Sequence, residues 1–157
     1  MTNPSRPASL PLALSAALLG QTFTSAAIFA PAVLAPAASV DVGVPASFVG
    51  LMTALIYLSA AFAAPQIGGR VPQWGALRVT QFGLVVAALG LALATLAHPW
   101  LVLLAALVIG VGYGPSTPSG SALLAGRTPP EIFNLVMSIR QTGIPAGGAL
   151  EIGRAHV

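Results

Sequence analysis

Apolar residues form five long runs along the chain, separated by short polar segments that are rich in Gly, Pro and Arg. About 20 apolar residues are enough for a helix to cross the roughly 30 Å hydrocarbon core of a bilayer. The pattern therefore predicts an all-α membrane protein with about five transmembrane helices. We expect these helices over residues 10–35, 46–64, 77–97, 101–124 and 130–150.

The first apolar run also has features of a secretory signal. Arg6 precedes an apolar core at residues 10–20, and small residues follow near Ser25. The apolar run resumes as far as Leu34, however, which favours an uncleaved first span. We expect Pro31 and Pro36 to bend or end this helix, because proline removes a backbone hydrogen bond.

Composition supports a lipid environment. Hydrophobic residues make up 56% of the chain and charged residues only 6%, whereas soluble domains carry about 25% charged residues. The six basic residues are all Arg and are scattered along the chain, so no dense basic surface for nucleic acid is predicted. The absence of Cys excludes disulfides. The partners expected are the lipid bilayer and a small-molecule substrate.

Arginine alternates between the predicted loops. The N-terminus and the second and fourth loops carry Arg6, Arg70, Arg78 and Arg127, while the first and third carry only Asp41 and His98. Basic residues collect on the cytoplasmic side of membrane proteins. Absence of Lys beside abundant Ala, Gly and Pro suggests a GC-rich bacterial gene. We therefore expect a multi-pass protein of the bacterial inner (plasma) membrane with a cytoplasmic N-terminus.

The last seven residues differ from what precedes them. Residues 151–157 bring two charges and a His directly after a Gly-rich apolar run. The codons GAG ATC GGA AGA GCA CAC GTC, a common sequencing adapter read in one frame, encode this segment. We interpret residues 151–157 as adapter read-through and residues 1–150 as a partial N-terminal transmembrane domain. A genuine short tail is the alternative.

Residues for catalysis are sparse. Outside the last seven residues there is one His, and the carboxylates Asp41 and Glu131 lie in loops on opposite sides of the membrane. These cannot form an acid–base pair or a metal-ligand cluster. We therefore expect no enzyme activity, no metal site and no cofactor.

Arg140 is the one charge inside an apolar run. It follows Glu131 by nine residues, or roughly 13 Å of helix, which places it near the bilayer midplane. Arginine at that depth is costly and should face protein or a wet cavity. We predict a substrate site formed by Arg140, Gln141, Gln21, Tyr113 and Thr117. Two alternatives stay open: Arg140 extends to the membrane interface, or the other polar residues only connect helices.

Three segments carry partial motifs. Gly68 and Gly75 have the spacing of a Gly-x-x-x-Asp-Arg-x-Gly loop motif, although Pro72 and Gln73 replace its Asp and Arg. Gly110 and Gly112 match Arg-x-x-x-Gly-x-Gly with Ala106 in place of Arg, and residues 143–148 are a loose Gly-Pro-x-x-Gly-Gly. In this order the motifs resemble the N-terminal part of a major facilitator superfamily transporter.

The resemblance implies half of a twelve-helix transporter, whose C-terminal half would be missing from this chain. It also implies a gating loop containing Gly68, Gly75 and Arg78. The departures at Pro72, Gln73 and Ala106 put the family's gating charges and a coupling residue in doubt.

Glycines and prolines in the predicted helices have two interpretations. Gly110, Gly112 and Gly114 can let helices approach closely. Helices interrupted by Gly or Pro can also mark a midplane site, and the first and fourth predicted helices are such a pair.

The function predicted is secondary-active transport of a small solute, an organic anion, by alternating access, with the fragment itself inactive. A small multi-span membrane subunit acting in a complex is the alternative.

Overall fold

The computed structural model describes residues 9–42, 45, 47–96 and 98–155, with backbone alone for residues 34–42, 154 and 155. This part of the chain is helical, with one 3-10 turn, η1, at Pro130–Ile132. The α-helices are α1 (Leu10–Val42), α2 (Phe48–Gly68), α3 (Val71–Trp74), α4 (Ala76–Ala94), α5 (Pro99–Tyr113), α6 (Ser116–Ala125), α7 (Phe133–Gln141) and α8 (Gly143–Ala155).

Four segments are long and apolar enough to cross a membrane, which confirms the all-α membrane fold class. They are Leu10–Val33, Phe48–Gly68, Ala76–Ala94 and Pro99–Ala125. The fifth predicted helix is divided into α7 and α8, neither of which reaches spanning length alone. The helix α8 continues to Ala155, across the boundary predicted at residue 150. The origin of residues 151–157 stays a prediction.

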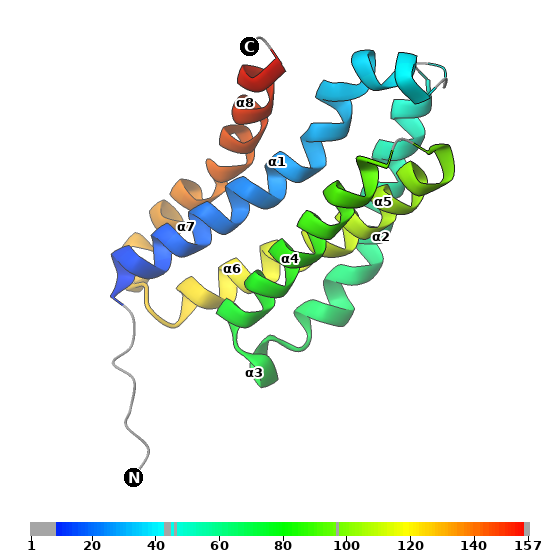
Figure 1. Cartoon of the computed structure of the whole chain (residues 1–157). Coiled ribbons are helices and arrows are strands. Elements are labelled where there is room, and N and C mark those ends of the chain that lie inside the picture. Colours follow the sequence, from blue (N-terminus) through cyan, green and yellow to red (C-terminus); the bar gives the residue numbers. More distant parts are fainter. Residues whose placement is uncertain (1–8, 43–44, 46, 97, 156–157) are drawn as a thin grey trace.

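The helices form a bundle in which the last helix lies beside the first. Figure 1 shows α8 running alongside α1, while α2 and α4 both pack on α5. One apolar cluster joins α1, α2, α4 and α5, with Ile56 and Ile109 fully buried in it. A second joins α1, α6 and α7 around Ala17, Leu124 and Val136. Along α1, a polar segment at residues 20–25 separates the two clusters.

Glycines bring α5 close to its neighbours. A Cβ on Gly112 would lie 2.6 Å from the Gly83 carbonyl oxygen of α4, and one on Gly114 would lie 2.6 Å from the Ala60 carbonyl oxygen of α2. A Cβ on Gly110 would collide with the Ile56 carbonyl oxygen and the Ser59 hydroxyl. These distances confirm the packing interpretation of the three glycines, since any side chain would push the helices apart.

The first helix is longer than predicted. It continues past Pro31 and Pro36 to Val42, so Asp41 belongs to its last turn and not to the first loop. Proline removes one hydrogen bond, but the Ala residues around it favour helix strongly. Of the two effects expected of these prolines, an end of the helix is therefore wrong, and a bend stays a prediction.

Helix interruptions occur in the fourth and fifth spans, not in the first and fourth. The fourth is interrupted at Gly114–Pro115, between α5 and α6. The fifth is interrupted at Thr142, whose N–H bonds to the Ile139 carbonyl at 3.1 Å in a tightened turn. Pro145, three residues later, has no N–H to offer the Gln141 carbonyl. The predicted pairing of helices one and four as discontinuous elements is therefore corrected.

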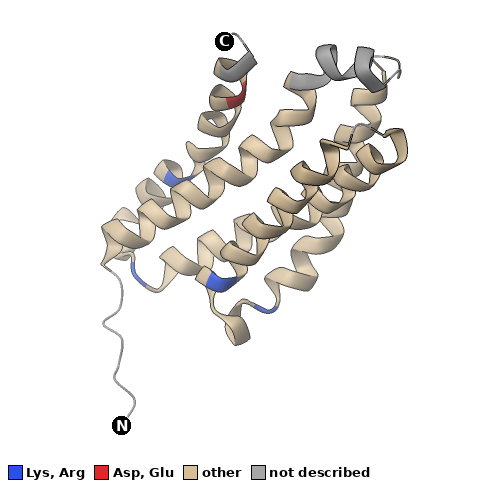
Figure 2. Cartoon of the chain, in the orientation of Figure 1, with Lys and Arg blue, Asp and Glu red and all other residues tan. Residues whose placement is uncertain are grey.

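Arginines gather at one end of the bundle. Arg70 precedes α3, Arg78 lies in the first turn of α4, and Arg127 follows α6. Successive spans alternate in direction, so these three positions share the end at which α1 begins. Figure 2 shows this basic end and a further basic segment on α7, away from it.

Candidate functional site

Arg140 is enclosed by other helices. It lies in the last turn of α7, and only 2% of its surface is exposed. Its Nη1 donates to the Gln21 side-chain oxygen on α1 at 3.3 Å and to the Thr117 carbonyl oxygen on α6 at 3.5 Å. The interpretation that Arg140 extends to the membrane interface was therefore wrong. Both bonds are longer than the usual 2.7–3.2 Å and are weak for a charged donor.

Gln21 is held in turn by its own helix. Its Nε2 donates to the Ser25 hydroxyl at 3.4 Å, one helical turn further along α1. Both side chains are buried, at 2% and 0% exposure. Gln21 occupies the middle of the apolar span Leu10–Val33, so the cluster lies far from both ends of the bundle. Ser25 was not predicted, although its i, i+4 spacing from Gln21 was readable in the sequence.

Tyr113 lies at the end of α5, beside the interruption between α5 and α6. It is half-buried and packs edge-to-face on Tyr57 of α2, with ring centroids 6.4 Å apart. Within the described part of the chain, the hydrogen bonds of Arg140 go to Gln21 and Thr117 and not to Tyr113.

Gly120 provides space for the guanidinium. A Cβ on this residue of α6 would lie 2.5 Å from Nη1 of Arg140 and within 3.5 Å of its Cδ and Cζ. Nothing near Gly120 in the sequence indicates this role, because the contact joins residues twenty positions apart. Gly143 gives similar access on α8, where a Cβ would lie 3.0 Å from Cβ of Gln21.

Two predicted residues do not reach the cluster with their side chains. Gln141 is exposed, since one residue along a helix turns the side chain by about 100° from Arg140. The side chain of Thr117 is exposed as well, and only its carbonyl faces Arg140. The structure thus joins Arg140 to the Gln21 side chain and the Thr117 backbone by hydrogen bonds, while the role of Tyr113 stays a prediction.

The predicted gating residues lie in and beside the second loop, at the basic end of the bundle. Gly68 ends α2, where a Cβ would lie 2.8 Å from Pro118 of α6. Gly75 has φ +85°, a conformation that glycine adopts without strain, and Arg78 is exposed. The loop is held by Arg70, whose guanidinium lies 5.0 Å from the Trp74 ring. Their gating role stays a prediction.

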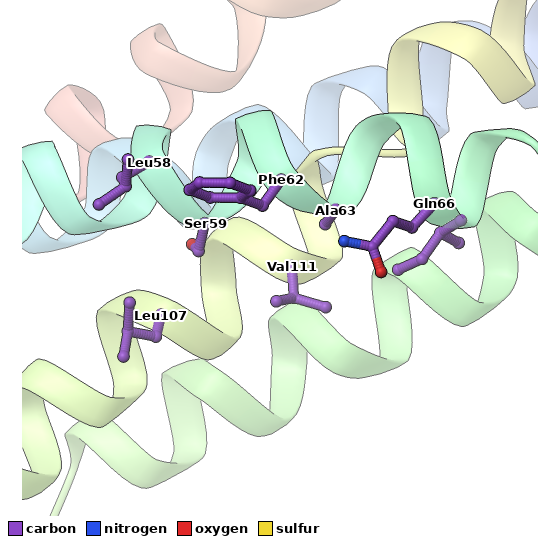
Figure 3. Close-up of a pocket in the computed structure, with 8 residues that line it drawn as sticks. Leu58, Ser59, Phe62, Ala63, Gln66, Leu107 and Val111 are labelled. Atoms are coloured by element: carbon purple, nitrogen blue, oxygen red, sulfur yellow. The ribbon is translucent and has the colours of Figure 1, made fainter.

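An apolar groove of about 360 Å³ lies between α2 and α5. Figure 3 shows Leu58, Phe62 and Gln66 on one side of it, facing Leu107 and Val111. The groove has no charged residue in its lining and contains none of the predicted substrate residues. Among the described residues, no three metal-ligating side chains come together either. The Arg140 cluster is therefore the candidate site.

Comparison with protein families identifies the chain. The family model described as Major Facilitator Superfamily matches residues 17–150, which include most of α1, most of α8 and every element between them. The chain belongs to the major facilitator superfamily. Neither a comparison with curated proteins nor one with solved structures finds a match.

Membership confirms the predicted family and the general function. Major facilitator proteins are multi-pass membrane transporters of small solutes, in agreement with the four apolar spans. The match also covers both Gln21 and Arg140, so the candidate site lies inside the region that defines the family.

Proposed function

We propose that this major facilitator protein takes part in secondary-active transport of a small organic anion by alternating access. The observation that carries the proposal is the buried Arg140, whose Nε has no hydrogen-bond partner within the described part of the chain. A buried guanidinium without a full set of partners is costly. Such a group persists where its binding to an anion is useful, and intramembrane charges generally mark transport pathways.

Position within the fold supports the same proposal. Arg140 lies near two helix interruptions, at Gly114–Pro115 and at Thr142. Interrupted helices near the bilayer midplane are a general feature of transporter binding sites. The bonds to Gln21 and Thr117 leave from Nη1 alone, so Nε keeps its capacity to bind a solute.

We further propose that a second set of helices completes the transport pathway. The superfamily pattern implied by the sequence motifs has twelve spans, and this chain supplies four full spans and the divided helix α7–α8. Large apolar side chains on α2 are exposed, with Phe62 at 66% and Leu58 at 54%. Lipid and further helices would cover these surfaces.

The membrane is proposed to be the bacterial inner membrane, with the N-terminus in the cytoplasm. The basic end of the bundle supports this orientation through the positive-inside rule (Figure 2). The chain has no Cys, so single cysteines report without background. A cysteine at the exposed position 73 should resist an impermeant thiol reagent added to intact cells, and one at position 98 should react. Labelling at position 73 from outside would reverse the orientation.

Transport itself is tested in proteoliposomes that contain the full-length transporter. We expect saturable uptake of an anionic solute that depends on an ion gradient or on exchange. A panel of radiolabelled mono- and dicarboxylates, with sugars and amines as comparison solutes, provides the measurement. Uptake restricted to cationic or neutral solutes would contradict the anion assignment.

A further inference from the structure

The two sides of the Arg140 guanidinium differ in their hydrogen bonding. Both hydrogen bonds that it makes within the described part of the chain leave from Nη1, to Gln21 and to Thr117. Nε is buried and has no partner there. Nε and Nη2 form the edge that can donate two parallel hydrogen bonds to a carboxylate. The protein therefore holds the guanidinium on one side and leaves its bidentate edge unused.

Gln21 on α1 positions the guanidinium through a hydrogen bond. Its side-chain oxygen accepts from Nη1, and its amide nitrogen donates to Ser25. The amide is thereby oriented with oxygen toward the guanidinium. Because Gln21 is neutral, it fixes the position of Arg140 without neutralising its charge. An acidic residue at position 21 would instead neutralise the charge of Arg140, which would then no longer attract an anion.

Gly120 on α6 positions the guanidinium by leaving space for it. Its missing side chain leaves just enough room for Nη1, since a Cβ would approach this atom to 2.5 Å. Alanine at this position would force Arg140 to move, and the move would change the direction of the Nε–Nη2 edge. Gly110, Gly112 and Gly114 bring backbones together, whereas Gly120 faces the end of a charged side chain.

We propose that Gln21 and Gly120 are positioning residues that hold Arg140 by Nη1, so that its Nε–Nη2 edge receives the carboxylate of the transported solute. The inference rests on the proposed function and adds two points to it. The group of the solute that binds is a carboxylate, and Gln21 and Gly120 orient Arg140 towards it. Arg140 is enclosed in the present conformation, so the carboxylate reaches the Nε–Nη2 edge in a more open conformation, in which Nη1 keeps its contacts with α1 and α6.

The test follows the Nε–H signal of Arg140 by NMR in the full-length transporter, labelled with ¹⁵N at arginine Nε. The signal is assigned by its loss in Arg140→Lys. The probes are acetate, benzoate and succinate, titrated at constant ionic strength against chloride. We expect at least one probe to shift the signal in the wild type and in Gly50→Ala. Gly50 is a matched control because a Cβ there meets nothing within 4 Å.

In Gly120→Ala, the same shift should require at least tenfold more probe. Gln21→Met, which removes the other hold and keeps the length of the side chain, should raise the required concentration at least threefold. This second variant keeps the inference testable if Gly120→Ala does not fold. Equal titration of Gly120→Ala, Gln21→Met and the wild type would overturn the inference.

A carboxylate from another part of the transporter is the competing source. In that case the Nε–H signal of the wild type would already show a strong hydrogen bond without probe and would not respond to any of the three. This outcome overturns the inference but not the proposed transport, which uptake in proteoliposomes measures separately. If the transporter accumulates a neutral solute and the Nε–H signal responds to none of the probes, transport is supported and the carboxylate assignment is overturned.

Discussion

The contacts of α5 with α2 and α4 differ from the surroundings of Arg140 in how they use space. At α5, glycines place backbones in direct contact, and apolar side chains such as Ile56 and Ile109 are fully buried. Around Arg140, hydrogen bonds of 3.3–3.5 Å connect polar groups, and Nε has no partner in the described structure. The first region is packed for stability. The second contains an unused hydrogen-bond donor, which under the proposed function is available to a solute.

The largest effect is expected where backbones touch. Gly110→Ala would place a methyl group against the Ile56 carbonyl and the Ser59 hydroxyl. Overpacking of this kind costs about 1–3 kcal/mol. Gly50→Ala on α2 is the control, since it gains helix propensity of up to about 1 kcal/mol without a collision.

Thermal unfolding in detergent, with yield of folded protein, measures the difference. We expect Gly110→Ala to melt several degrees lower than the wild type and Gly50→Ala to melt at the same temperature or higher. If the two variants melt together, α5 and α2 are not held by close backbone contact.

Arg140 should matter more for binding than for folding. Arg140→Gln removes hydrogen bonds to a charged group that are worth about 1.5–3 kcal/mol, roughly a 10- to 150-fold loss of affinity for anionic solutes. Arg140→Lys should also weaken binding, because Lys cannot form the bidentate pair. Concentration dependence of uptake gives the affinity. Unchanged affinity in a folded Arg140→Gln protein would remove Arg140 from the site.

A smaller effect is expected for the hydrogen bond between α4 and α6. The Thr80 hydroxyl lies 3.0 Å from that of Ser119, which bonds onward to the Pro115 carbonyl at 2.7 Å. Thr80→Val keeps the shape and removes the bond. Bonds between membrane helices are worth about 0.6–2 kcal/mol, so unfolding temperature should fall by a few degrees while transport affinity stays constant. A change in affinity alone would connect Thr80 to the site instead.

The smallest effect is expected for Ser116. Its Oγ is buried and has no partner among the described residues, so Ser116→Ala removes an unsatisfied group. The expected change in unfolding free energy is within about 1 kcal/mol and towards greater stability. A clear loss of transport would show that the hydroxyl contacts the solute.

The sequence predicted the features that depend on local composition. Apolar runs located the spans, because a helix in lipid must be apolar over a fixed length. Arg140 was found because it breaks such a run, and Gln21 because it is one of few large polar residues in the first span. The predicted helix ends were less accurate, with α2 extending through Pro65 to Gly68 and not ending at residue 64.

Features that join distant parts of the chain could not be predicted. The contact between Gln21 and Arg140 spans 119 residues, and the space at Gly120 exists only once α6 and α7 are packed. Orientation within a helix was also hidden. Gln141 was included because it neighbours Arg140, but helical geometry turns it to the exposed side.

The order of Gln21, Thr117 and Arg140 along the chain has a consequence for synthesis in the membrane. Both acceptors are translated before Arg140, so they can already lie in the bilayer when α7 leaves the ribosome. Inserting an arginine at the centre of a helix costs about 2.5–3.5 kcal/mol on insertion scales. The early helices offer the arriving guanidinium two acceptors that lipid lacks. We therefore expect α1 to aid insertion, and loss of the Gln21 side chain should lower the fraction of chains that place α7–α8 across the membrane.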